Sequence, residues 1–79
     1  MRAEQAVQLV VEEYGRAVKE HKPFNSAHEG YAVLKEEVDQ LWGCIKGNVA
    51  DQLTREEAAQ VGAMALRSLI DPCNAEKDR

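Results

Sequence analysis

The residues best suited to chemistry are the carboxylates of residues 27–46, a stretch that also carries the strongest apolar pattern of the chain. On a helical projection Glu37 lies at the border of that apolar pattern, next to Leu34 and Leu41. A carboxylate at such a border can turn toward the interior of a helical bundle, where it could meet a metal ion or a phosphate. Three polar residues fall on roughly the opposite side: Glu29, Glu36 and Gln40. The alternative is that all of these side chains form an ordinary solvated acidic face.

The apolar residues of 27–46 predict the helix that would position these carboxylates. They recur at steps of three and four, with Trp42 beside them: Ala27, Tyr31, Leu34, Val38, Leu41 and Ile45. We expect Trp42 and Tyr31 to pack in a core or a subunit interface rather than to stack on a base. Ser26 and Glu29 match a capping box at the start of this helix, which gives Glu29 a structural role as the alternative to ligand binding.

Two further helices are predicted on either side of this one. Residues 3–21 repeat at helical spacing, and Pro23 breaks the pattern. A third helix is predicted over residues 55–70, where Thr54 and Glu57 match a second capping box. Its expected apolar side consists of Ala58, Val61, Gly62, Ala65, Leu66, Leu69 and Ile70.

These elements predict an all-α fold with an up-down-up arrangement of three helices. Residues 1–79 form a single domain, and we expect its ends, residues 1–2 and 72–79, to be frayed. Gly15 either permits a neighbouring helix to approach or is simply tolerated. Because a chain of 79 residues buries only a modest core, and the apolar side of 27–46 is broad, we expect an obligate homo-oligomer, either a dimer or a tetramer.

The composition excludes several classes of protein. With 44% hydrophobic and 30% charged residues the chain is globular, and its net charge of −4 gives no basic surface for nucleic acid. Cys44 and Cys73 lie far apart and form neither a zinc pattern nor a disulfide framework, which is typical of the reducing cytoplasm. The sequence shows no signal peptide and no apolar run long enough to span a bilayer. We therefore expect a cytoplasmic protein without a membrane partner.

The sequence resembles the MazG-like all-α nucleoside triphosphate pyrophosphohydrolases, in particular their compact phage or mobile-element members. Two runs carry the resemblance: Glu36-Glu37-Val38-Asp39-Gln40, and Glu57-Ala58-Ala59-Gln60 sixteen residues later. The family motif is E-E-x-x-E on one helix and E-x-x-D on the next. The resemblance covers residues 26–71.

The resemblance implies a site for Mg²⁺ or Mn²⁺. Glu37 and Glu57 match two metal ligands of the family, and Glu36 matches the other glutamate of the pair and is the candidate catalytic residue. Gln40 and Gln60 stand where the family has two further carboxylates, so the site is partly degenerate. Lys35, one residue before the pair, is a candidate for substrate binding.

The family activity implied is cleavage of a nucleoside triphosphate to the monophosphate and pyrophosphate with a divalent metal. The alternative function is a non-catalytic helical oligomer or adaptor that retains the scaffold. Nucleoside triphosphates and further copies of the chain are the expected partners.

Overall fold

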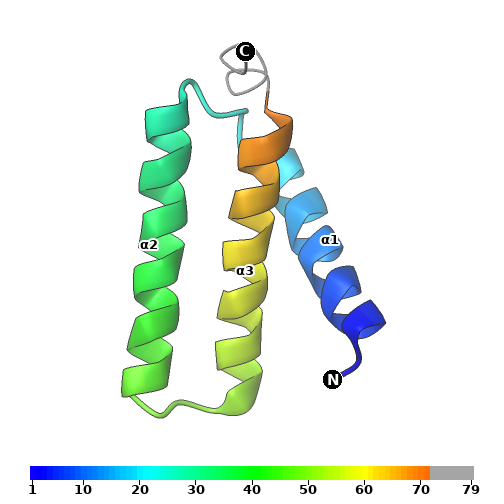
Figure 1. Ribbon diagram of the computed structural model, residues 1–79, viewed down its shortest axis with the longest axis vertical. Helices are drawn as coiled ribbons and strands as arrows, with labels where there is room; N and C mark the ends of the chain where they lie inside the picture. Colours follow the sequence, from blue (N-terminus) through cyan, green and yellow to red (C-terminus); the bar gives the residue numbers. More distant parts are fainter. Residues whose placement is uncertain (72–79) are drawn as a thin grey trace.

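The computed structural model describes residues 1–71 and consists of three helices (Figure 1). They are α1 (Ala3–Glu20), α2 (Ala27–Lys46) and α3 (Asp51–Ile70). No strand occurs in the described part of the chain, so the predicted all-α fold is confirmed. None of the described helices is long and apolar enough to cross a membrane. Arg2 precedes α1 and its backbone N–H donates to Gln5 Oε1 at 2.8 Å, whereas residues 72–79, predicted to be frayed, lie outside the described residues.

The caps of α2 explain why this helix has the predicted bounds. Ser26 Oγ accepts a hydrogen bond from the Glu29 backbone N–H at 3.0 Å. The Glu29 carboxylate accepts in return from the Asn25 backbone N–H at 2.6 Å. At the other end Asn48 adopts the left-handed conformation, with φ of 54°, which terminates the helix. Glu29 therefore caps the helix, which is the structural role that the sequence offers as the alternative to ligand binding.

The predicted start of α3 is wrong. The helix begins at Asp51, four residues before the expected position, and Ala50 occupies the N-cap. Thr54 already lies within the first turn, where its hydroxyl donates to the Ala50 carbonyl at 3.5 Å. Asp51 supplies the negative charge that favours a helix N-terminus. Glu57 therefore lies in the second turn and has no capping role.

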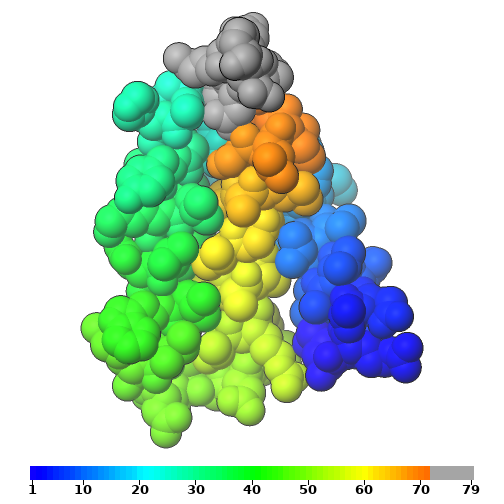
Figure 2. Space-filling view, viewed as in Figure 1, coloured from blue at the N-terminus to red at the C-terminus, as the bar shows by residue number. Residues whose placement is uncertain are grey.

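The three helices form a layer with α3 in the middle (Figure 1). α3 packs against both α1 and α2, while α1 and α2 barely touch each other. α2 and α3 run antiparallel side by side, and α1 diverges from them toward its N-terminus. Figure 2 shows a gap between the N-terminal halves of α1 and α3. The up-down-up topology is therefore an open layer in the single chain.

The buried core is small and lies where α1, α3 and the α1–α2 connection meet. It consists of Ala17, Phe24, Ala63 and Met64, with Tyr14, Val33 and Leu34 packed around it. Two glycines permit the close contacts. A Cβ on Gly62 would lie 3.0 Å from Val10 Cγ2 of α1, and a Cβ on Gly30 would lie 3.0 Å from the Phe24 ring. A Cβ on Gly15 would meet nothing within 4 Å, so Gly15 does not mediate a helix contact within the chain.

The apolar side predicted for α3 is also largely wrong. Four of its seven residues are exposed: Ala58, Ala65, Leu69 and Ile70. The buried residues of α3 are instead Ala59, Ala63, Met64 and Arg67. Small apolar residues occur all around this helix, so the apolar pattern does not distinguish its inner side. Because α3 packs between two helices, its inner surface is determined by both neighbours.

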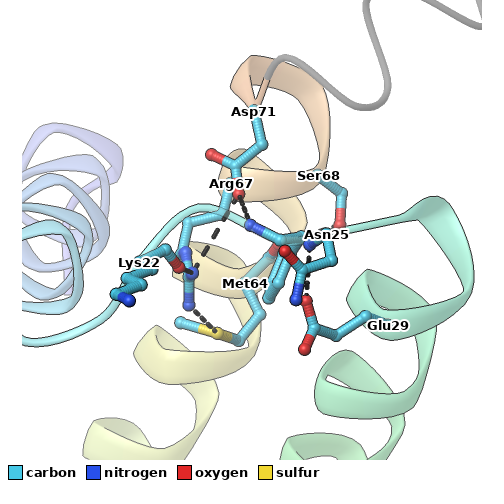
Figure 3. A network of polar contacts seen from close by, with 8 residues as sticks. Lys22, Asn25, Glu29, Met64, Arg67, Ser68 and Asp71 are labelled. Atoms are coloured by element: carbon cyan, nitrogen blue, oxygen red, sulfur yellow. Dashed lines mark hydrogen bonds and ion pairs between the residues drawn. The ribbon is translucent and has the colours of Figure 1, made fainter.

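A buried polar cluster holds the α1–α2 connection against the C-terminal end of α3 (Figure 3). Arg67 Nη2 donates to the Lys22 carbonyl at 2.8 Å, and the guanidinium lies 4.0 Å from the centroid of the Phe24 ring. Asp71 Oδ2 lies 4.0 Å from Arg67 Nη2 and accepts from the Phe24 backbone N–H at 2.8 Å. Arg67 and Asp71 are only 4% and 7% exposed. This cluster fixes residues 22–24 over one end of the layer.

Candidate functional site

α2 and α3 bring Glu37 and Glu57 together. Both side chains are half-buried, because each projects from its helix toward the other helix. One oxygen of each, Glu37 Oε1 and Glu57 Oε2, is closed off from solvent and has no hydrogen-bond partner in the described part of the chain. Two carboxylates can only accept hydrogen bonds, so neither can satisfy the other while both are ionised. The pair needs a proton or a cation between its members.

The pKa of Glu37 reflects the repulsion within this pair. A hydrogen bond that protonated Glu37 can make to Glu57, burial, and the negative charges of Glu57, Glu36 and Glu13 raise the pKa of Glu37 to about 7. A neutral Glu37 can donate to Glu57 and so removes one unpartnered acceptor. Glu37 is therefore a carboxyl group that takes up a proton near neutral pH when no cation is bound.

A cavity of about 740 Å³ extends from Glu37 toward the α1–α2 connection, and Glu57 is not among the residues that line it. α1 and α2 form its walls and α3 forms its floor, because the two outer helices do not close over α3. Acidic side chains of α2, Glu36 and Glu37 among them, line one wall. Three cationic side chains line the opposite wall and the far end: Arg16, Lys22 and Arg67. Glu13 and Glu20 line the same wall as Arg16, so carboxylates occur on both walls, and Lys22 and Arg67 lie at the far end.

The remaining predicted site residues occupy different places. Glu36 and Gln60 line the cavity, Glu36 exposed and Gln60 half-buried. Gln40 is exposed and does not line it. Lys35 is also outside the cavity, where its ammonium pairs with Asp39 at 3.0 Å. The Asp39 carboxylate raises the pKa of Lys35 through this hydrogen bond and its charge.

The sequence alone did not place two of the residues that line the cavity. Glu13 of α1 lines it near Glu37, and its carboxylate pairs with Arg16 at 2.9 Å. Arg67 is buried at its far end. The helical pattern placed neither residue, because a charged residue's position relative to another helix depends on how the helices pack. For Arg67, Asp71 four residues later is the one local signal of a partner.

The two carboxylates fit a hard divalent cation only in part. Mg²⁺ takes oxygen ligands and is held in many proteins by one or two carboxylates, with waters and substrate phosphates completing its coordination. Glu37 and Glu57 match that requirement, and their unpartnered oxygens are suitable donors. No group of three or more acidic, histidine or cysteine side chains suited to a metal occurs among residues 1–71. A cation here would therefore depend on ligands from outside the chain.

Comparison of the chain with protein-family models, with curated proteins and with solved structures found no match.

Proposed function

We propose that the chain is a MazG-like nucleoside triphosphate pyrophosphohydrolase-type protein whose Glu37 and Glu57 hold Mg²⁺ or Mn²⁺. The observation that carries this proposal is the pairing of these carboxylates across α2 and α3, each with one buried oxygen that has no hydrogen-bond partner within residues 1–71. The resemblance in sequence names the same two residues as metal ligands. We place the activity in the cytoplasm, which agrees with the free thiol of Cys44.

The cavity supports a polyphosphate substrate. When bound, the cation would neutralise phosphate charge and lower the pKa of a bound water. Glu37 and Glu57 would hold the cation, and Glu36, which lines the same wall, would accept a proton from the attacking water. Arg16 on the opposite wall would have to exchange its ion pair with Glu13 for a phosphate oxygen to neutralise charge that the cation does not. Cleavage gives the nucleoside monophosphate and pyrophosphate.

Metal-dependent stabilisation tests this proposal directly. We expect Mg²⁺ or Mn²⁺ to raise the melting temperature of the pure protein, and Glu37→Ala and Glu57→Ala to abolish the rise. Glu12→Ala, an exposed carboxylate of α1, is the matched control and should respond like the parent protein. Pyrophosphate release from a panel of nucleoside triphosphates then tests activity. An equal metal response in all three variants would place binding elsewhere.

The second candidate function is a non-catalytic helical oligomer that keeps the scaffold. Three observations favour it. No group of three or more metal-ligating side chains converges among the described residues, and Gln40 stands exposed where the family has another carboxylate. Large apolar side chains remain uncovered on all three helices, Trp42 and Leu69 among them. Self-association without any metal response or triphosphate cleavage would support this function over the first.

A further inference from the structure

Each helix leaves a stripe of apolar side chains uncovered. On α2 the stripe contains the only tryptophan of the chain, Trp42, which is 55% exposed. The complete set is Val7, Val11 and Val18 on α1, Tyr31, Val38, Trp42 and Ile45 on α2, and Ala58, Ala65 and Leu69 on α3. The members recur at steps of three, four and seven within each helix, so each stripe lies along one side of its helix. We call these ten residues the apolar face.

The apolar face lies on the side of the layer opposite the cavity. At 3.6 residues per turn, the stripe of α2 is about half a turn from its cavity-lining residues Glu29, Val33 and Glu36. The stripe of α1 is likewise opposite Arg16 and Glu20. The same relationship holds on α3, where Ala58, Ala65 and Leu69 lie opposite Gln60, Ala63, Met64 and Arg67.

All three helices line one cavity on one side of the layer. The side chains that point away from the cavity therefore lie on the other side of the layer. The α1–α2 connection lines the cavity and passes behind α3 in Figure 1. Figures 1 and 2 therefore view the molecule from the side of the apolar face. The chain has one charged, hollowed side and one apolar side. A soluble domain ordinarily covers such an apolar side with a second layer.

We propose that a second copy of this chain covers the apolar face, so that two layers pack against each other and both cavities open outward. This inference specifies the surface used in the self-association proposed above and rests on that proposal. It does not depend on catalysis, because the Glu37–Glu57 pair and the apolar face are on different sides.

The size of the apolar face suits such a contact. From the exposed fractions of its eight large side chains it presents roughly 850 Å² per subunit, close to the ~800 Å² per partner of a stable protein interface. Monomeric proteins rarely leave so large an apolar patch uncovered. A contact through the charged side would bring together many carboxylates of a chain with net charge −4. The apolar face avoids that repulsion.

The shape of the apolar face favours an identical partner. Ala58 and Ala65 make its middle low along α3, while Tyr31 and Trp42 make the α2 edge high. A two-fold arrangement can place the α2 ridge of each copy in the α3 hollow of the other, so every contact is made twice. The four helices α2 and α3 of the two copies would then form the centre of the interface, as in a four-helix bundle.

Trp42 fluorescence and sedimentation equilibrium, each from about 1 to 200 µM protein, test the proposal. We expect a dimer at high concentration whose tryptophan emission is blue-shifted, with a shift to the emission of a solvated ring on dilution. Ile45→Glu, on the apolar face at 53% exposure, should weaken association at least 100-fold and leave the emission red-shifted. Val11→Glu, on the α1 stripe of the apolar face, should also weaken association.

Leu53→Glu is the matched control, because Leu53 is 54% exposed but lies on the side of α3 that faces α2 and the cavity. It should dimerise like the parent protein. A dimer that persists in Ile45→Glu with a solvated Trp42 would overturn the choice of face but leave self-association standing. A protein that is monomeric by sedimentation and folded by circular dichroism at all concentrations would overturn both. It would point to a different protein as the occupant of the apolar face.

Discussion

Glu37 of α2 and Glu57 of α3 each bury one carboxylate oxygen that no donor among residues 1–71 satisfies, and Glu57 is the acidic group that acts most strongly on Glu37. Such a pair is stable at neutral pH only if a proton or a cation separates its charges. The fold therefore holds two mutually repelling carboxylates close together, and Glu37 of this pair lines the cavity. Structural carboxylates are usually paired with a cation or fully hydrated, and this pair is neither.

The metal-free protein should lose stability as the pH rises from 5 to 8. The folded-state pKa of Glu37, about 7, lies above its ordinary value of 4.5, so between these values the folded protein binds more protons than the unfolded chain. The free energy of unfolding therefore falls with rising pH across this window. We expect a loss on the order of 1–2 kcal/mol, since solvent reaching this half-buried carboxyl weakens the effect. Urea unfolding with a chelator present measures it.

Glu37→Gln is the control for this pH dependence. The amide keeps a donor for Glu57 and cannot ionise, so the fall between pH 5 and 8 should largely disappear. The charges that act on Glu37 come from Glu57 on α3, Glu36 on α2 and Glu13 on α1. An unchanged pH profile in Glu37→Gln would mean that another group carries the titration.

Restoring carboxylates should have unequal effects at the two degenerate positions. Gln60 lines the cavity one turn after Glu57, whereas Gln40 is exposed and outside it. Gln60→Asp should therefore lower the Kd for Mn²⁺ about tenfold, which corresponds to ~1.4 kcal/mol, because an added charge near the cation attracts it. Gln40→Glu should change the Kd less than threefold. Calorimetric titration measures both, and equal gains would show that the cation does not sit at the cavity.

Helix positions could be predicted from this sequence far better than the sides on which the helices meet. The span of α2 followed from Ser26, Glu29 and the apolar repeat, since a cap and a period are both local. The start of α3 could not be predicted in the same way. Thr54 and Glu57 match a capping box, whereas Asp51 offers an acidic first turn four residues earlier. Both signals are local, and neither one excludes the other.

The candidate site shows the same division. Glu37 and Glu57 could be named from the resemblance, and their contact across α2 and α3 agrees with it. The positions of Arg67 and Glu13 in the cavity could not be predicted, because they depend on the open layer that α3 makes with its neighbours. The buried side of α3 could not be predicted from the sequence either, since small apolar residues occur on every side of this helix.

Among the charged residues, Arg67 should lower the free energy of unfolding most when it is replaced. Arg67→Ala removes the donor to the Lys22 carbonyl and the stack on Phe24, and leaves Asp71 buried without its cation. We expect a loss of about 3–5 kcal/mol, measured by urea unfolding at fixed protein concentration. Arg67→Lys should recover only part of it, because lysine lacks the planar, forked donors. Arg55→Ala, at an exposed position, should stay within about 0.5 kcal/mol of the parent.

Two helical glycines should respond to alanine in opposite directions. A Cβ on Gly43 would meet nothing within 4 Å, so Gly43→Ala should stabilise the protein by about 0.5–1 kcal/mol through helix propensity alone. A Cβ on Gly62 would lie 3.0 Å and 3.3 Å from the two methyl carbons of Val10. Valine is stiff about χ1, so this contact must push α1 away from α3, and Gly62→Ala should cost about 1–3 kcal/mol. Val10→Ala costs stability by itself, but in combination with Gly62→Ala it should lose less than the sum of the single changes. Strict additivity in that cycle would show that α1 does not rest on Gly62.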